Sequence, residues 1–136
     1  MALNVHRVFE NGSSYGSYHS AIAVSDTQEA VLRDARDKIR DAIRTGLRLW
    51  ETLVEKSVLF DQAVAGMEPP RLRPKFRMQG SFSYRTQIEP AHLPPQQMDL
   101  DDGLFLPVSY ISQGRDNRPV VASLGLFQAV EKALEP

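Results

Sequence analysis

Apolar residues recur at steps of three and four between residues 25 and 64, which is the spacing of one face of an amphipathic helix. This face carries Leu32, Ala35, Ile39, Ala42, Ile43, Trp50, Leu53, Val54 and Val58. We expect a start near Ser25 or Asp26, where Asp26 and Glu29 give a capping-box pattern, and an end before Gly66. One straight helix of this length would measure about 60 Å at ~1.5 Å per residue. The sequence therefore predicts a kink near Gly46 or two helices, with Trp50 in the core.

The pattern changes between residues 75 and 86. Charged or polar residues alternate with apolar ones from Lys75 to Gln79, as in a half-buried strand. Gly80 and Ser81 then allow a tight turn with close backbone approach to a ligand. Residues 82–86 suit the first turn of a short helix, whose free N–H groups and a serine hydroxyl favour an anion. A Gly-Ser pair after a strand is also common as a simple turn, so this segment alone leaves both interpretations open.

A second motif runs from Met98 to Gly103 and contains three aspartates. If it forms a strand, Asp99 and Asp101 share one face about 6–7 Å apart, and Asp102 points the other way. Two carboxylates together with substrate phosphates suit magnesium, which keeps several waters as ligands. The apolar run of residues 103–110 would continue the strand and anchor the aspartates in a sheet. Because Asp-Asp-Gly is also a common turn sequence, an acidic turn is the competing interpretation.

Taken in order, these two motifs resemble the core of the cGAS/DncV-like nucleotidyltransferases, and most closely the DncV-like branch. The matching residues are Gln79, Gly80, Ser81, Phe82, Tyr84, Thr86, Pro90, Gln97 to Gly103 and Pro107. The proline-containing insert of residues 87–97 is a further mark of that branch. The resemblance implies an α+β fold, a polymerase-β-type nucleotidyltransferase core with a mixed sheet and flanking helices. A long N-terminal helix precedes this core, and the family's C-terminal helical lobe is missing.

The same resemblance implies the residues of an active site. Gln79, Gly80 and Ser81 would contact or shape the pocket for the donor triphosphate, and Tyr84 would lie near the base. Asp99 and Asp101 would be catalytic and would hold two Mg²⁺ ions, or Mn²⁺ in their place. One ion would activate the attacking ribose hydroxyl and the other would neutralise the leaving pyrophosphate.

The resemblance also implies a function. The chain would be the N-terminal part of a cyclic GMP–AMP-like synthase that makes a cyclic di- or oligonucleotide from ATP, GTP or other nucleoside triphosphates. The product would be a second messenger in bacterial anti-phage (CBASS) signalling, where ubiquitin-transfer-like ancillary proteins are expected partners. The family's third acidic residue, on a later strand, is absent, and we expect another polypeptide or segment to supply it. Two alternatives stay open: a non-catalytic module that binds nucleotide or a partner protein, and a transferase acting on a protein or RNA acceptor.

On this basis we divide the chain into residues 1–65, an N-terminal loop and a long bracing helix, and residues 66–136, the first part of the nucleotidyltransferase core. The glycine-containing stretch of residues 11–17 is expected to be a loop, and residues 65–74 a stiff, proline-rich connector. Residues 120–134 are expected to form a further helix. A basic stripe of Arg33, Arg36, Arg40, Arg44 and Arg48 follows the long helix. Because Asp34, Asp37 and Asp41 lie nearby, we interpret the stripe as a solvated face rather than as a ligand site.

The amino-acid composition excludes several classes of protein and several kinds of site. Hydrophobic residues make up 42% and charged residues 24%, as in an ordinary globular domain. With no cysteine the chain has no disulfide and no thiolate site, and its histidines, His6, His19 and His92, are too scattered for a metal cluster. A net charge of −1 argues against a protein that coats nucleic acid. No apolar stretch approaches the ~20 residues of a membrane span, and the first residues lack a signal-peptide core, so we expect a cytoplasmic protein without a membrane partner.

Overall fold

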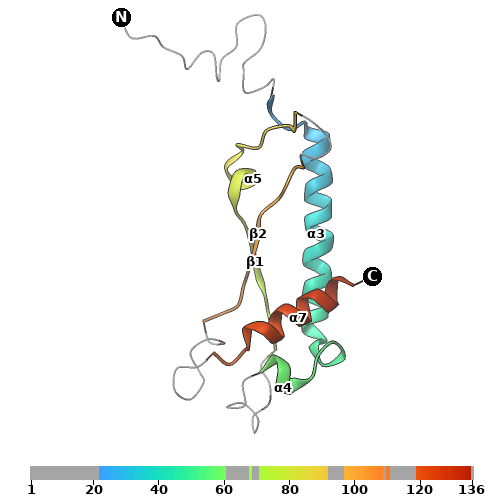
Figure 1. The fold of residues 1–136 in the computed structure, drawn as a ribbon, viewed down its shortest axis with the longest axis vertical. Helices are drawn as coiled ribbons and strands as arrows, with labels where there is room; N and C mark the ends of the chain where they lie inside the picture. Colours follow the sequence, from blue (N-terminus) through green and yellow to red (C-terminus); the bar gives the residue numbers. More distant parts are fainter. Residues whose placement is uncertain are drawn as a thin grey trace, which may run out of the picture. The chain divides into compact units, whose positions relative to one another are not determined.

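The computed structural model describes residues 22–60, 68, 71–91, 97–108, 110 and 119–135. The expected loop at residues 11–17 and all three histidines lie outside these ranges. The described elements mix helices with a two-stranded sheet, which confirms the α+β class (Figure 1). In chain order they are α3 (Asp26–Arg48), the 3-10 turn η1 (Trp50–Thr52), α4 (Lys56–Leu59), β1 (Lys75–Met78), α5 (Gly80–Tyr84), β2 (Asp102–Phe105) and α7 (Ser123–Leu134).

Contacts divide the chain into two compact units. The first unit comprises residues 1–34 and 78–101, and the second comprises residues 35–77 and 102–136. The turn at Gly80 and Ser81 and the Asp99/Asp101 pair belong to the first unit, whereas most of the described apolar core belongs to the second.

Helix α3 begins at Asp26, and its capping box differs by one residue from the predicted one. The backbone N–H of Gln28 donates to Ser25 Oγ at 3.3 Å, and the Ser25 N–H donates to Gln28 Oε1 at 2.9 Å. Ser25 and Gln28 therefore form the reciprocal box, and the prediction that Asp26 and Glu29 form it is wrong. Both acidic residues instead lie in the first helical turn, where a negative charge favours the helix dipole.

Helix α3 ends at Arg48, well before the predicted end near residue 64. The Leu49 N–H donates to the carbonyls of Thr45 and Gly46, which tightens the last turn, and η1 and α4 follow. Of the two alternatives, a kink near Gly46 is wrong and a second helical segment is right. Gly46 has another role, because a Cβ built on it would lie 2.3 Å from Ala133 Cβ. Its missing side chain allows α7 to approach α3.

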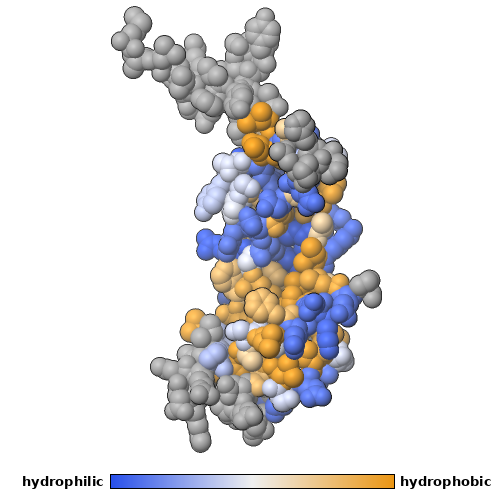
Figure 2. All heavy atoms as spheres, in the orientation of Figure 1, coloured by the Kyte–Doolittle hydropathy of each residue, from blue (hydrophilic) through white to orange (hydrophobic). Residues whose placement is uncertain are grey.

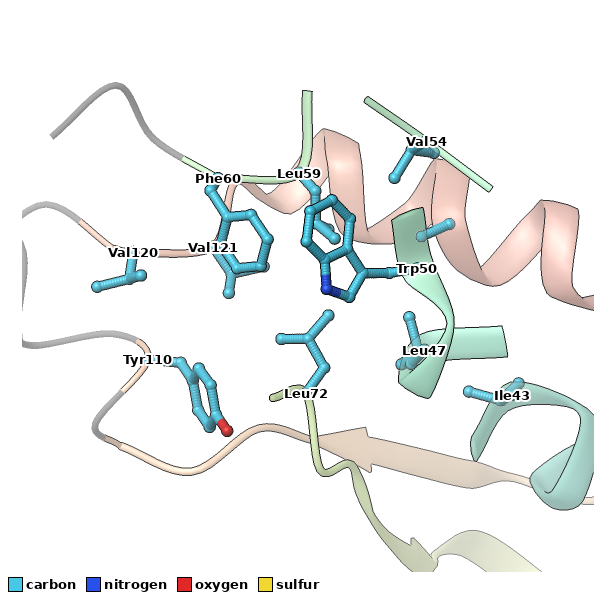
Figure 3. Packing of buried hydrophobic residues seen from close by; sticks show 11 residues of the cluster. Ile43, Leu47, Trp50, Val54, Leu59, Phe60, Leu72, Tyr110, Val120 and Val121 are labelled. Carbon is cyan, nitrogen blue, oxygen red and sulfur yellow. The ribbon is translucent and has the colours of Figure 1, made fainter. Parts of the chain in front are cut away.

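The core of the second unit forms around Trp50, which is 7% exposed, as the periodicity predicts. Its ring meets that of Phe60 edge to face, with 5.0 Å between the centroids and 78° between the planes. Such a pair contributes about 0.5–1.5 kcal/mol beyond the area it buries. The other buried residues of the cluster are Ile43, Leu47, Val54, Leu59, Leu72, Tyr110, Val120, Val121 and Ala129, most of them drawn in Figure 3.

Helix α7 starts at Ser123 rather than at Val120. The two preceding valines are buried, and Val121 forms an antiparallel bridge with Phe60 instead of entering the helix. Apolar side chains gather around α7 on the face drawn in Figure 2. The large exposed ones on this helix are Leu124, Phe127 and Leu134. No described helix is long and apolar enough to cross a membrane.

The predicted strand around the aspartates is shorter than expected. Strand β2 begins at Asp102 and ends at Phe105, so Asp99 and Asp101 precede it and residues 106–108 are not in a strand. The backbone hydrogen bonding between the two strands nevertheless extends one residue before β2, because the Gln79 N–H donates to the Asp101 carbonyl at 2.9 Å. The prediction that Asp99 and Asp101 lie within a strand is therefore wrong, although Asp101 is held by backbone pairing next to one.

The basic stripe of α3 is a solvated face only in part: the Arg33 and Arg44 side chains are 43% and 49% exposed, and Arg36 and Arg44 pair with Asp37 and Asp41. The Arg36 and Arg40 side chains are only 12% and 16% exposed. The guanidinium groups of Arg40 and Arg44 lie 5.5 and 5.0 Å from the centre of the Phe76 ring, and that of Arg33 lies 4.9 Å from the Phe82 ring. A guanidinium is planar and weakly hydrated, so it stacks on aromatic faces where an ammonium would stay in water.

Candidate functional site

The Gly-Ser turn lies where the sequence predicts it, directly after β1. Gln79 is extended, with φ −131° and ψ −176°, and Gly80 opens the five-residue helix α5 with φ +62°. An L-residue with a side chain pays about 1–2 kcal/mol in this left-handed region, so glycine is the residue that the turn requires. The strand and the short helix expected from residues 75–86 are therefore present, but the helix begins at Gly80 rather than at Phe82 and ends at Tyr84.

Asp101 lies directly against this turn. Its backbone carbonyl accepts the Gln79 N–H, and a Cβ built on Gly80 would be 2.0 Å from Asp101 Oδ2 and 3.0 Å from Cγ. Any side chain at position 80 would displace the carboxylate. Because Gly80 has none, the Asp101 carboxylate sits beside the backbone of the turn, and residues 21 positions apart come together in one site.

Asp99 is held by a contact that the sequence analysis missed. Gln87 Nε2 donates to the Asp99 backbone carbonyl at 2.7 Å. Asp99 and Asp101 are both exposed, and Leu100 between them is half-buried. The backbone of Asp99 is thus fixed while its carboxylate stays open to solvent. A glutamine in a proline-containing insert gave no signal of this contact beforehand.

Two features hold the short helix α5 in place: the buried side chain of Phe82 and the turn that follows Tyr84. Phe82 is 5% exposed and lies beneath the Arg33 guanidinium. After Tyr84 the chain makes a Schellman turn, in which the Thr86 N–H donates to the Ser81 carbonyl at 2.9 Å and Arg85 takes φ +56°. Ser81 is half-buried on this helix, whereas Tyr84 is 77% exposed. The placement leaves the Tyr84 ring free to meet a ligand.

The third aspartate of the motif has a different environment. Asp102 accepts hydrogen bonds from Arg40 Nε and from the terminal Arg40 NH2 nitrogen, both at 2.6 Å, and the two side chains are 17% and 16% exposed. The hydrogen bond to Asp102 raises the pKa of Arg40. A bidentate pair of this kind occupies both carboxylate oxygens. Asp102 is thus a structural partner of α3.

The donor set fits a divalent cation in part. Among the described residues no three His, Cys, Asp or Glu side chains come together as a metal site. Asp101 beside the glycine turn and the exposed Asp99 two residues before it carry, however, the kind of hard oxygen donors that magnesium takes when phosphates and waters complete its shell. The two carboxylates would hold such an ion only together with substrate phosphates and further ligands.

A strand, a Gly-Ser turn and an Asp-x-Asp pair, of which Asp101 lies against that turn, are the features by which the sequence resembles the nucleotidyltransferases. Residues 74–136 match the family described as the nucleotidyltransferase domain of cyclic GMP-AMP synthase DncV-like proteins. This match covers a little under half of the chain, and it agrees with the resemblance seen in the sequence. Every predicted site residue falls inside the matched range, and α3 lies outside it.

A curated relative supports the same assignment. The cyclic GMP-AMP synthase of Escherichia coli is 34% identical over 65 residues, which are 48% of this chain and 14% of that protein. The chain thus spans about a seventh of the length of this relative. No solved structure gives a significant match.

Proposed function

We propose that this chain is part of a magnesium-dependent nucleotidyltransferase that joins nucleoside triphosphates into a cyclic di- or oligonucleotide. The observation that carries the proposal is the contact of the Asp101 carboxylate with Gly80, inside the range matched by the family. The synthase activity of the E. coli relative favours a cyclic GMP–AMP-like product made from ATP and GTP. The proposed role is second-messenger synthesis in the bacterial cytoplasm during anti-phage (CBASS) defence.

Each residue of the site has a proposed role. The backbone of Gly80 and the hydroxyl of Ser81 bind the triphosphate of the donor, and Gln79 shapes the turn through its bond to Asp101. The exposed Tyr84 ring lies against the base. Asp99 and Asp101 are the residues that would hold Mg²⁺ or Mn²⁺. When bound, such ions supply activation of the attacking hydroxyl and neutralise charge on the leaving group.

The work of the protein residues is then positioning and electrostatics. Gly80 lets the backbone approach the phosphates, and the Gln87 contact fixes the Asp99 backbone relative to the insert. Holding reacting groups in place contributes to the rate without covalent catalysis. Residues 66–136 would be the first part of the catalytic core, and residues 1–65 would brace it.

We propose that a further segment or second polypeptide supplies the third carboxylate and the helical lobe. The 14% coverage of the relative motivates this part of the proposal. Ubiquitin-transfer-like ancillary proteins are the other proposed partners. A non-catalytic, nucleotide-binding module is the second candidate, and it is favoured by the absence of a three-ligand metal group among the described residues.

The test is a separation of labelled products after incubation with Mg²⁺ and all four nucleoside triphosphates. Asp99→Ala and Asp101→Ala run beside the parent chain, with Glu131→Gln, an exposed change on α7, as the matched acidic control. A phosphatase-resistant product that both aspartate variants lose and the control keeps would support catalysis. Mg²⁺-dependent nucleotide binding without product would favour the module. A chain that shows neither would refute both proposals.

A further inference from the structure

A cavity of about 850 Å³ lies in the second unit, lined by the last turns of α3 and the segment of residues 71–74 that leads into β1. Among the residues that the structure describes, its lining contains four arginines and one acidic residue, Asp41. Arg44 and Arg48 come from α3, and Arg71 and Arg73 from the segment. The volume falls within the ~300–1,000 Å³ typical of small-molecule sites.

The core determines where the two segment arginines lie. Leu72 is 3% exposed and lies in the cluster with Trp50 and Leu47 (Figure 3), while Arg71 and Arg73 on either side of it are exposed. Because neighbouring side chains of an extended segment point in opposite directions, burying Leu72 turns both arginines outward. The Tyr110 hydroxyl donates to the Arg71 carbonyl and holds the segment in this register.

The helix presents its two arginines by a separate mechanism. Arg44 and Arg48 are four residues apart and therefore lie on the same face of α3. Leu47 is fully buried and fixes the rotation of this last turn. Four arginines from two independently anchored elements thus line one cavity.

Within the part of the chain that the structure describes, the charges of this cavity are not balanced. Arg44 has a carboxylate partner, Asp41 Oδ1 at 2.8 Å, and its guanidinium also stacks on Phe76. Arg48, Arg71 and Arg73 have no carboxylate partner among the described residues. Like charges converging on one cavity repel, and an anion bound there would relieve that cost. The planar guanidinium matches phosphate oxygens in bidentate geometry.

We propose that this cavity binds a phosphate chain of two or more phosphate groups, with Arg48, Arg71 and Arg73 as its principal ligands. The phosphate chain is either inorganic or part of a nucleotide. The cavity shares no residue with the nucleotidyltransferase site at Gln79–Tyr84 and Asp99–Asp101. Binding there needs no divalent metal, because the protein supplies the positive charge.

The test is isothermal titration of the full chain with inorganic tripolyphosphate in EDTA, at two salt concentrations. Arg48→Gln and Arg73→Gln are each expected to weaken binding by about tenfold or more, because each loses a charge-assisted hydrogen bond. Arg77→Gln is the matched control, since this exposed arginine lies on β1 outside the cavity lining, and it is expected to stay within twofold. Arg73→Lys keeps the charge without the bidentate geometry, so its affinity for tripolyphosphate should lie between the affinities of Arg73→Gln and Arg77→Gln.

A parallel titration with ATP in EDTA identifies the source of the phosphate chain. Equal affinities for ATP and tripolyphosphate would mean that the phosphates suffice, and tighter ATP binding would mean that the nucleoside also contacts the cavity. Asp101→Ala should leave both affinities unchanged, which separates this cavity from the proposed catalytic site. Absence of saturable tripolyphosphate binding, or an equal loss in Arg77→Gln, would overturn the proposal.

Discussion

Substituting Gly80 by alanine tests the contact on which the candidate site depends. Two costs are expected. Holding alanine at φ +62° costs about 1–2 kcal/mol, because its Cβ crowds the following carbonyl. The new Cβ would also start 2.0 Å from Asp101 Oδ2, so the carboxylate has to leave its rotamer at about 0.5–1.5 kcal/mol. We therefore expect the free energy of unfolding to fall by roughly 2–3 kcal/mol.

A double-mutant cycle separates the two costs. In an Asp101→Ala background the atoms nearest to the new Cβ are gone and only the Asp101 Cβ position, at 3.3 Å, remains. Gly80→Ala should then cost about 0.5–1.5 kcal/mol less, whereas the backbone cost persists. Gly80→Asn complements the cycle, because asparagine tolerates the left-handed region and isolates the clash.

The assay is urea unfolding followed by far-ultraviolet circular dichroism, with hydrogen exchange at the Gln79 amide as a local probe. That amide donates to the Asp101 carbonyl, so a displaced Asp101 should lower its protection. The reasoning is refuted if Gly80→Ala costs the same with and without the Asp101 carboxylate. A cost below about 0.5 kcal/mol in the parent chain would refute it as well.

Three further substitutions test the rest of the structure. Asp102→Asn should destabilise the fold by about 2–3 kcal/mol, because it leaves the half-buried Arg40 guanidinium without its carboxylate; an unchanged urea midpoint would contradict the pairing. Arg85→Gly should stabilise by about 0.5–1 kcal/mol, because φ +56° suits glycine, and a lower melting temperature would argue against strain there. Leu47→Ala, at a fully buried position, should cost about 2–5 kcal/mol, whereas Leu49→Ala, at 53% exposure, should stay within about 0.5 kcal/mol. Tryptophan fluorescence during unfolding measures the last pair, and equal costs would place the core elsewhere.

Sequence patterns predicted those helices, strands and turns that depend on residues close together in the chain. The helical period of α3, the alternation in β1 and the glycine turn after it are all visible within a few residues of sequence. The end of α3 is not, because Trp50 and Val54 continue the helical spacing beyond Arg48. Trp50 and Val54 are buried because they pack in the cluster that contains Phe60. Packing partners from other segments do not change the helical spacing, so the spacing alone does not show where the helix ends.

The sequence predicted which residues lie in the candidate site better than it predicted how they contact one another. Gly80 and Asp101 were grouped by the order of two motifs, and only the structure shows that the carboxylate rests on the glycine. Arg40 was assigned to a solvated stripe, whereas its partner Asp102 lies 62 positions away. Pairs so distant in sequence require the fold before they can be seen. The metal and nucleotide roles of the site residues remain predictions.

The close approach of Gly46 to Ala133 constrains how this sequence can change over time. A Cβ at position 46 would lie 2.3 Å from the Ala133 Cβ and 3.1 Å from Leu53 Cδ1, so the two helices share a volume that holds one methyl group. An alanine at position 46 therefore requires glycine at position 133, and even then the new Cβ would lie 3.3 Å from the Cα of residue 133. Among related chains these two positions should vary together, so each substitution along the lineage depends on the one that preceded it.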